Sequence, residues 1–419
     1  MSGTHLQRVS VPAADLSALA LRAERELKGN ILPFWLAKVR NVENGGFFGF
    51  IDADMVIRKG AARGGLLTCR ILWTFSAAYR CYRDRSYLEM ATWAYRDLVD
   101  HFWDAEAGGF FWTIPEQGGA TKEAGKLIYL QVFGIYALAE YYRATDDELS
   151  LAKSIATYRL IEAHARDPAH GGYFDALDRN WNRLASTQHY ALGRAPKSVN
   201  SHMHILEAYT NLLRVWDEPA LRESQRELLR VLMRRCVDPF TYHSIPLMTE
   251  TWEPIGNAVS YGHDIELSWL ISEAAGVLGD AVLTAEIERV SLAMANVTIA
   301  EAVDTDGGVI SSSGPDHATD KEWWSQAEAA VGFFNAYQIS GDSRLFEASR
   351  RSWDYIETWF VDRAHGDWIE KVRRDGTPIR RPKVTLWRCP YHSSRACMEL
   401  TERVHQQLER IGPGSPMQT

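Results

Sequence analysis

An all-α fold is predicted by this sequence: six helical hairpins that close into an (α/α)6 barrel, with short hairpin strands or loops at one end. A Gly-Gly-aromatic motif recurs with a spacing of 63 residues, from Gly45 to Gly108 and from Gly108 to Gly171. Between the copies, apolar residues recur at steps of three and four, the period of an amphipathic helix. A unit of about 63 residues holds two helices of typical length with their loops, so six units account for nearly all 419 residues.

The turns between helices carry the repeat. The full motif is followed by weaker copies, at Gly307-Gly308-Val309-Ile310 and at His365-Gly366-Asp367-Trp368. An aspartate opens several of these turns: Asp104, Asp167, Asp304 and Asp362, with Asp238 near the expected fourth position, where the glycines are lost. Paired helices can also stack in an open array, which needs polar capping repeats at its ends. We favour the closed ring, in which inner helices surround a funnel and these turns lie at one common end.

The segments between the turns are predicted to be helices, most clearly 127–142 and 198–216, where the apolar spacing is regular. Several helices end at acidic or Gly-Asp turns, such as Gly279-Asp280 and Gly341-Asp342. No linker or low-complexity stretch divides the chain. We therefore expect residues 1–411 to form a single domain and residues 412–419, rich in Gly and Pro, to be a disordered tail.

Bulk composition excludes several functions. A net charge of −8 argues against nucleic-acid binding, which needs a basic face. No apolar run reaches the roughly 18 residues that span a bilayer, and the first residues lack the apolar core of a secretion signal. The five cysteines form no C-x-x-C pair. A cytoplasmic, reduced protein without membrane contact is expected. Its 47 aromatic residues (15 Trp, 17 Tyr, 15 Phe) suit sugar rings, but they also suit large helical cores.

Two histidines are predicted to lie at the starts of helices. His263 follows Gly262 in Ser260-Tyr261-Gly262-His263-Asp264-Ile265-Glu266, with Glu266 three residues on along the same side. His392 follows Pro390, which favours the first helical position. Because a helix N-terminus disfavours the imidazolium ion, both rings are expected to be neutral, the state that a general base needs. Either histidine alone is equally well explained as a structural residue.

Three further segments carry candidate residues. In 197–207, Asn200 and His204 are four residues apart and share a helix face, whereas His202 points away. Arg70 stands in an otherwise apolar helix, where an unpaired buried charge is costly, so it must be paired or functional. The tandem Trp323-Trp324 is either core or a stacking platform for a ligand. His204 alone is more simply a hydrogen-bonded core histidine.

Two rival chemistries use the same residues. A metal site would draw on the three histidines and Glu266, but no two of these histidines have the i, i+4 spacing of a helical metal pair. A glycosidase would need two carboxylates facing across the scissile bond, for which Glu266, Glu328 and Asp264 are candidates. The histidines would then have no assigned role. We expect neither a metal nor another cofactor.

Taken together, these segments resemble the N-acylglucosamine 2-epimerase superfamily, and within it the cellobiose 2-epimerase branch, which includes D-mannose 2-epimerase-like members. The matching stretches, spread along the whole chain, are 69–76, 197–216, 260–269, 321–328 and 387–397. The family's Ser-(Tyr/Phe)-Gly-His-Asp-Ile-Glu motif matches at 260–266, and its Trp-Lys-Cys-Pro-Tyr-His motif matches at 387–392 with Arg388 in place of lysine. The resemblance implies an (α/α)6 barrel, in agreement with the six units counted from the repeat.

The resemblance also implies a reaction, the inversion of C2 of an aldose through a cis-enediolate. It assigns His263 and His392 as base and acid on the two faces of C2, with Arg70 holding the developing oxyanion. Glu266 would orient His263. Supporting contacts fall on Asn200, His204, Tyr129 and Glu328, and the sugar would lie between Trp323 and Trp387. If one base served both C1 and C2, the product would instead be a ketose.

This sequence departs from the family pattern outside the reacting centre. An Asp-x-Asn-Glu segment, which helps to hold the second sugar of a disaccharide, is replaced by 192–196, where no carboxylate occurs. Ser325 and Ser393 replace a usual proline and a usual asparagine, and Thr385-Leu386 replace a usual glycine–aromatic pair. D-mannose with D-glucose is therefore as reasonable a substrate as cellobiose. The expected partner is a small sugar, and the expected assembly is a monomer or a weak homodimer.

Overall fold

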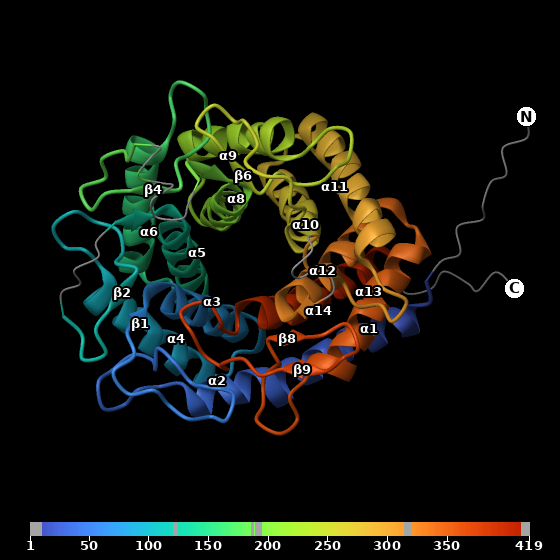
Figure 1. Ribbon diagram of the computed structural model, residues 1–419, viewed down its shortest axis with the longest axis horizontal. Coiled ribbons are helices and arrows are strands. Elements are labelled where there is room, and N and C mark those ends of the chain that lie inside the picture. The colour runs from blue at the N-terminus through green and yellow to red at the C-terminus, as the bar shows by residue number, and fades with distance from the viewer. Residues whose placement is uncertain (1–10, 120–124, 186–187, 189–194, 314–319, 412–419) are drawn as a thin grey trace, which may run out of the picture.

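The computed structural model describes residues 11–119, 125–185, 188, 195–313 and 320–411, and it confirms the predicted (α/α)6 barrel. The inner ring seen in Figure 1 consists of α3 (Gly65–Tyr82), α5 (Ile128–Thr145), α8 (Val199–Leu213), α10 (Tyr261–Leu278), α12 (Trp323–Ser340) and α14 (Tyr391–Ile411). Each inner helix packs against the next, and α14 packs back against α3, which closes the ring. The predicted tail at 412–419 lies outside the described residues.

The outer layer is formed by the other helix of each hairpin. It consists of α1 (Ala13–Glu26) with α2 (Leu32–Lys38), α4 (Arg85–Asp97), α6 (Glu148–Leu160), α9 (Pro219–Val231), α11 (Ala281–Ala302) and α13 (Ser343–Tyr355). Outer helices bury one stripe: in α9 the buried positions include Leu221, Leu228 and Leu229. Inner helices are covered on nearly all sides, and α5 buries fifteen of its eighteen residues. This difference follows from position, because an inner helix contacts both its ring neighbours and the outer layer.

Five outer segments of the described chain contain a π-helical turn, and in four of them this turn is the last part of the outer segment before the chain crosses to the next inner helix. These turns are η1 (Leu27–Ile31), η2 (Leu98–Phe102), η3 (Ile161–Ala165), η4 (Leu232–Cys236) and η5 (Ile356–Phe360). After all but η1, which runs on into α2, the next residue is extended or bridged and the repeated turn follows. The structural repeat therefore includes the π-helical turn at the end of the outer helix as well as the Gly-Gly-aromatic turn. The residues of the π-helical turns share no obvious sequence motif.

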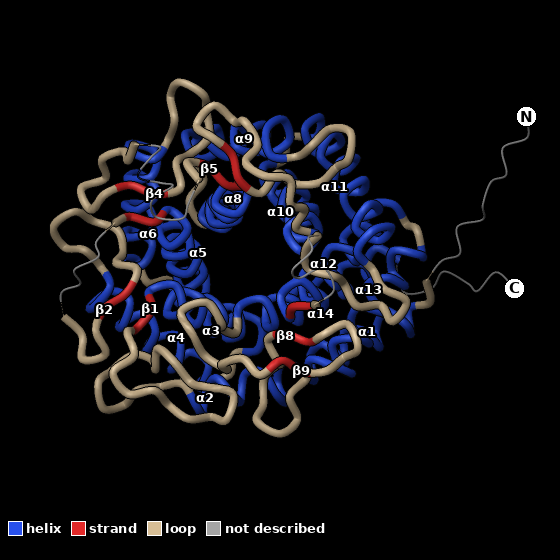
Figure 2. The backbone as a smooth tube through the Cα atoms, in the orientation of Figure 1, coloured by secondary structure: helices blue, strands red, loops and turns tan. Residues whose placement is uncertain are grey.

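Short strands lie at the end of the barrel that carries the repeated turns, as Figure 2 shows. They pair antiparallel: β1 (Arg63–Gly64) with β2 (Thr113–Ile114), β3 (Lys126–Leu127) with β4 (Ala176–Leu177), β5 (Lys197–Ser198) with β6 (Leu247–Met248), and β7 (Lys321–Glu322) with β8 (Lys371–Val372), which also pairs with β9 (Pro378–Ile379). β1, β3, β5 and β7 each lead directly into an inner helix. The pairing thus fixes where α3, α5, α8 and α12 begin.

Buried lysines hold the aspartates of the repeated turns at three of these junctions, those of β3, β5 and β7, and in the segment before α14. Asp167 accepts the backbone N–H groups of Ala169 (2.9 Å) and His170 (3.2 Å), while Lys197 Nζ lies 2.7 Å from its other oxygen. The same pairing recurs as Lys126–Asp104, Lys321–Asp304 and Lys383–Asp362. A charge that loses its partner in such a place is costly, so each pair ties a turn to the helix start beside it.

The second glycine of the motif allows that turn to approach the next inner helix. Gly109 has φ +70, and a Cβ there would fall 2.5 Å from Gln131 Oε1 on α5. The following N–H, of Phe110, donates to that oxygen at 2.7 Å. His202 occupies the equivalent place on α8, where its Nε2 accepts the Tyr173 N–H at 3.0 Å. His202 therefore serves the turn and points away from His204, as the sequence predicts.

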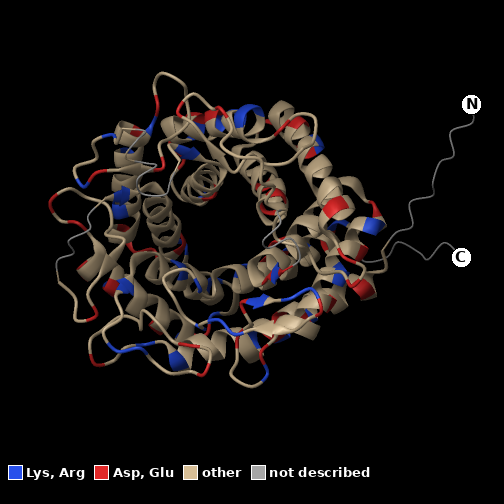
Figure 3. Ribbon diagram, in the orientation of Figure 1, with Lys and Arg blue, Asp and Glu red and all other residues tan. Residues whose placement is uncertain are grey.

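Acidic and basic residues are interspersed along the ribbon in this view (Figure 3), in keeping with the moderate net charge. Among the described residues, no helix combines the length and apolar character that crossing a bilayer requires.

Candidate active site

The first turns of the inner helices surround a cavity of about 150 Å³ at the strand-bearing end. Nine of the ten candidate residues line it, together with Trp324: Arg70, Tyr129, Asn200, His204, His263, Glu266, Trp323, Trp387 and His392. The tenth, Glu328, lies behind His392 and contacts its ring. Residues up to about 320 positions apart in the sequence meet here because every inner helix begins at this end.

His392 is the second residue of α14, which begins at Tyr391, one residue later than the proline suggests. Its Nδ1 lies 2.7 Å from Glu328 Oε1 on α12. A carboxylate at Nδ1 favours the tautomer with the proton on that atom, which leaves Nε2 as the basic nitrogen. Burial, together with the charges of Arg70 and Arg395, lowers the pKa of His392 well below its usual value. The ring is therefore neutral at physiological pH.

His263 is the third residue of α10, in the helix start that the sequence predicts. Its Nδ1 lies 2.7 Å from Oγ of Ser260, the residue just before the helix. Burial lowers the pKa of His263 to about 4, and the nearby His204 acts in the same direction. Neutral histidines were expected from the helix N-terminus, but the larger cause at both positions is burial. The two rings differ in support: a carboxylate holds one and a hydroxyl holds the other.

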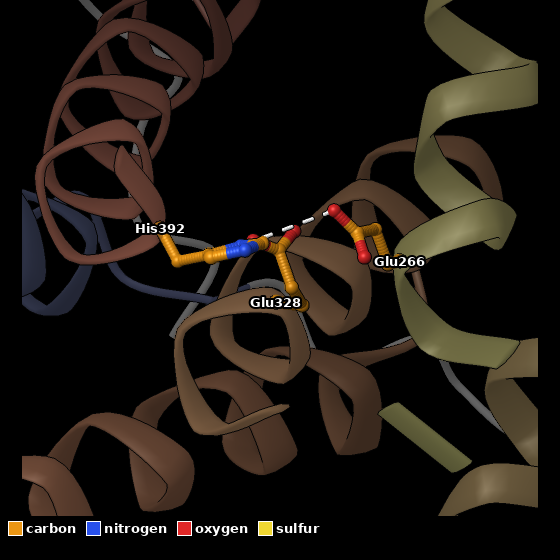
Figure 4. A group of neighbouring side chains, drawn as sticks. All are labelled: Glu266, Glu328 and His392. Atoms are coloured by element: carbon orange, nitrogen blue, oxygen red, sulfur yellow. Dashed lines mark hydrogen bonds and ion pairs between the residues drawn. The ribbon is translucent and has the colours of Figure 1, made fainter. Parts of the chain in front are cut away.

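Glu266 does not orient His263 as the sequence suggests. Its Oε1 accepts a hydrogen bond from Arg395 at 2.7 Å and lies 3.9 Å from Nδ1 of His392. Figure 4 shows Glu266, Glu328 and His392 converging from α10, α12 and α14. Glu266 is three residues after His263, and its side chain points toward Arg395 inside the ring of helices. Ser260, three residues before His263, lies beside the imidazole.

Arg395 connects the carboxylates of the site. It donates to Glu266 and Glu328 at 2.7 Å each and also contacts Glu207. Burial alone would raise the pKa of Glu207, but Arg395 and a hydrogen bond with His204 hold it at about 2. Burial raises the pKa values of Glu266 and Glu328, and for Glu266 the neighbouring Glu328 charge adds to the effect. One guanidinium thus braces three acids around the histidines.

His204 is hydrogen-bonded to Glu207, one of the three acids that contact Arg395. Its Nδ1 lies 2.8 Å from Glu207 Oε2, which is one helical turn further along α8. The ring of Tyr129 meets His204 edge to face with centroids 5.1 Å apart. Burial lowers the pKa of His204. His204 therefore presents a neutral, oriented ring to the cavity.

Arg70 is the cation that faces the cavity without an acidic partner. It is buried and donates to the Tyr129 hydroxyl at 2.7 Å, with its guanidinium 4.3 Å from the centre of the Phe133 ring. Among the described residues no carboxylate lies within ion-pair distance of it. A buried charge of this kind is costly to fold around and is suited to bind an oxyanion.

Three lining residues carry buried polar atoms that have no partner among the described residues. These atoms are Arg70 Nε, Asn200 Oδ1 and Trp323 Nε1. Buried polar groups are normally satisfied, so their convergence on one cavity indicates a polar ligand. Trp387, 46% exposed, stands at the mouth beside Trp112, with ring centroids 5.2 Å apart. Trp323 is almost buried.

Glu266, Glu328 and His392 offer donor atoms within 4.8 Å of one another, close enough for a metal ion. Arg395 already donates to both carboxylates, and His392 bonds to Glu328 through Nδ1. A divalent cation would have to displace the guanidinium and take the nitrogen that the carboxylate now holds. The donor set fits an ion-pair network better than a metal centre.

Sequence reasoning did not assign roles to Ser260 or Arg395, and it named Trp324 only together with Trp323, as core or as a stacking platform. The ring centroid of Trp324 lies 4.9 Å from that of His263 and 5.8 Å from that of His392. The centroid of Trp323 lies 6.3 Å from that of His392. The signal that drew attention to Arg70, an arginine in an otherwise apolar helix, does not mark Arg395, which follows a histidine and two serines in a more polar helix. Nothing local distinguishes Ser260 from an ordinary helix-capping serine.

Comparison with known proteins agrees with this geometry. A family model for N-acylglucosamine 2-epimerase (GlcNAc 2-epimerase) matches residues 46–396. A cellobiose 2-epimerase from Bacteroides fragilis is 40% identical over 382 residues, which cover 90% of this chain and 97% of that protein. The solved structure of cellobiose 2-epimerase from Bacillus thermoamylovorans B4167 has a TM-score of 0.87 and 35% identity, and the match covers 92% of this chain and 100% of that one.

A more distant relative, a D-mannose isomerase from Marinomonas mediterranea, is 21% identical and covers 85% of this chain and 91% of that protein. The family match includes α3, α5, α8, α10 and α12 in full and the first turn of α14, so both His263 and His392 lie within it. The resemblance seen in the motifs is confirmed, and the chain belongs to the N-acylglucosamine 2-epimerase family.

Proposed function

We propose that this protein is a cofactor-independent aldose 2-epimerase that interconverts the gluco and manno configurations at C2. The family makes the chain an enzyme of the isomerase class. One observation carries the proposal. Two neutral histidines, each hydrogen-bonded through Nδ1, line one small cavity together with Arg70, which pairs with no carboxylate among the described residues. Such a site can remove a weakly acidic C–H proton and stabilise the resulting oxyanion.

The proposed reaction begins with the open-chain aldose. Nε2 of one histidine takes the C2 proton, and the C2–H electron pair moves into a C1–C2 double bond as the carbonyl oxygen becomes an enediolate. Arg70 binds the oxygen on which this charge develops. The second histidine takes up a proton from solvent when the sugar binds and donates it to the opposite face of C2, and the carbonyl re-forms. The first histidine then releases the abstracted proton to solvent, so both rings are neutral again. The sugar is inverted at C2 and no oxidant, reductant or metal is consumed.

The hydrogen-bond partners of the two histidines differ in their effect when an imidazole becomes charged during this reaction. Glu328 can stabilise an imidazolium at His392, whereas the Ser260 hydroxyl offers His263 no negative charge. Glu207 supports His204 through Nδ1 in the way that Glu328 supports His392. His204 and Asn200 are proposed to hold the sugar hydroxyls.

We propose the reducing-end glucose of cellobiose-type disaccharides as substrate, with D-mannose and D-glucose as smaller alternatives. The similar proteins at 35–40% identity are named cellobiose 2-epimerases. The exposed Trp387 at the cavity mouth, beside Trp112, offers an aromatic surface to a second sugar ring. The relative named D-mannose isomerase favours a second activity, aldose–ketose isomerisation, which requires one histidine to carry the proton from C2 to C1. Cytoplasmic location and a monomer or weak homodimer stay predictions.

The test incubates the protein with cellobiose and with D-mannose in D2O containing EDTA, followed by 1H NMR and chromatography. We expect the C2 epimer as main product, with deuterium at C2, and unchanged rates in EDTA. A ketose as main product would replace epimerisation by isomerisation. Free glucose from cellobiose would indicate hydrolysis, and loss of activity in EDTA would indicate a metal. Failure of C2 to exchange with either sugar would refute the proposal.

A further inference from the structure

The inner helices enclose a second cavity at the end of the barrel opposite the candidate active site. Its volume is about 470 Å³, roughly three times that of the cavity at the helix starts. The residues around it stand in the later turns of the same helices, such as Arg80 of α3, Asn211 of α8 and Gln338 of α12. All six inner helices contribute to it. The volume lies within the range of small-molecule sites.

The floor of this second cavity is aromatic. Trp73 and Tyr136 stack in parallel with ring centroids 5.2 Å apart, and both line the cavity. The indole N–H of Trp73, a residue only 6% exposed, has no hydrogen-bond partner among the described residues. Beneath the floor, Trp73 meets Tyr391 edge to face, and the Tyr391 hydroxyl donates to Glu207 of the candidate active site. Tyr391 therefore connects the floor of this cavity to the acidic network of the candidate active site.

The walls are charged but balanced. Five arginines and five glutamates line the cavity. Glu140 is held between two arginines, Arg80 at 2.8 Å and Arg143 at 2.7 Å. Arginines near helix C-termini also offset the negative end of each helix dipole, so their presence does not by itself indicate an anion.

Two more pairs complete the wall. Arg214 lies 2.5 Å from Glu273, and Arg403 lies 2.8 Å from Glu399. Arg403 also donates to Asn335 Oδ1 at 3.1 Å. A ligand with a net charge would be attracted by one member of each pair and repelled by the other. Neutral hydroxyl groups, which both donate and accept, can bond to either member.

We propose that this cavity is a second carbohydrate site, which binds a neutral mono- or disaccharide without converting it. An aromatic floor, paired guanidinium and carboxylate groups and amide side chains together suit a polyhydroxylated ring. The histidines that could abstract a proton line the other cavity, so the bound sugar is not turned over. The proposal does not depend on the reaction proposed above.

Gly276 of α10 gives a direct way to fill the cavity. It lines the cavity, and a Cβ built on it meets nothing within 4 Å. Gly276→Trp should therefore place a large side chain in the space without a clash at its base. Gly276→Ala is the matched control, since it makes the same backbone change and leaves the space open. Trp73→Phe is a second variant, which shrinks the aromatic floor from an indole to a phenyl ring.

The test is equilibrium dialysis with radiolabelled methyl β-cellobioside, whose blocked reducing end cannot open. We expect wild type and Gly276→Ala to bind one molecule per chain more than Gly276→Trp does, and Trp73→Phe to bind this molecule at least about tenfold more weakly, the factor that 1.4 kcal/mol corresponds to. Cellobiose turnover in Gly276→Trp should stay within about twofold of wild type, far below that factor.

Equal stoichiometry in Gly276→Trp and Gly276→Ala would overturn the proposal, provided that circular dichroism shows both variants folded. If Gly276→Trp does not fold, unchanged affinity in Trp73→Phe would overturn it. Displacement of the sugar by millimolar sulfate or spermidine, but not by unlabelled cellobiitol, would show a charged-ligand site and also overturn it. Because the probe cannot react, loss of binding here and absence of epimerisation are separate results.

Discussion

Replacing Glu328 with glutamine tests the support of His392 at a single atom. Glu328 Oε1 lies 2.7 Å from His392 Nδ1 and accepts from Arg395, while Oε2 accepts from the Trp269 indole. Glutamine keeps the shape and can still accept through its amide oxygen, so the main loss is the negative charge beside the imidazole. The buried guanidinium of Arg395 keeps Glu207 and Glu266, and we expect the variant to fold.

The size of the effect follows from the kind of hydrogen bond lost. A bond to a charged group contributes about 1.5–3 kcal/mol, against about 0.5–1.5 kcal/mol for a neutral bond. Because glutamine keeps a neutral bond, the loss is the difference between the two, about 1–1.5 kcal/mol. If His392 is charged in the transition state, kcat of Glu328→Gln should therefore fall about 5- to 13-fold. KM should change little, because Glu328 lies behind the imidazole and does not line the cavity.

Ser260→Ala is the matched control at the other histidine. It removes a neutral partner of His263 Nδ1, so a fall of about 2- to 10-fold in kcat is expected. The assay is initial-rate epimerisation of cellobiose, with circular dichroism melting to compare folding. A Glu328→Gln kcat within twofold of wild type, or a larger loss in Ser260→Ala than in Glu328→Gln, would refute the assignment of charge to His392.

Further predictions concern chemistry, pH and stability. His263→Asn and His392→Asn should each abolish deuterium incorporation at C2, measured by 1H NMR; wild-type-like exchange in either would contradict the two-base scheme. Burial lowers the pKa of both histidines, that of His263 to about 4, so the neutral bases persist as pH falls. We expect kcat/KM to show no acidic limb with a midpoint between about pH 6 and 7, where an ordinary histidine titrates; such a midpoint would contradict the assignment. Lys197→Met leaves the buried Asp167 carboxylate without its cation and should destabilise the fold by about 3–5 kcal/mol, read from urea denaturation; a change below about 1 kcal/mol would show that the clamp is dispensable. Gly276→Ala should raise stability by up to about 1 kcal/mol, since it replaces a helical glycine in open space, and a clear loss would mean that the space is not open.

The repeat predicted the architecture because its cause is local. The aspartate and the two glycines of each turn act within a few residues, through backbone hydrogen bonds and positive φ angles that depend on the residue type alone. The period of the apolar residues likewise reports which helix face is covered. The positions of His263 and His392 at helix starts follow from the same local signals.

The partners of those histidines were not predictable in this way. The family resemblance implied that Glu266 orients His263, but in the structure Glu266 bonds to Arg395 and Ser260 bonds to His263. Glu328 meets His392 across 64 residues, and Arg395 meets Glu266 across 129. Contacts of this range depend on which inner helices become neighbours and on how each is rotated about its axis.

What the sequence by itself determined was the six-hairpin ring, the end at which its turns gather and the residue types that line the site. Only the tertiary structure decided which acid supports which histidine, that Arg70 faces the cavity without an acidic partner, and that a second cavity lies at the opposite helix ends. The physical reason is range. Turn and helix signals act within one or two turns of chain, whereas a buried charge is stabilised by whatever the closing of the ring brings within a few ångströms of it.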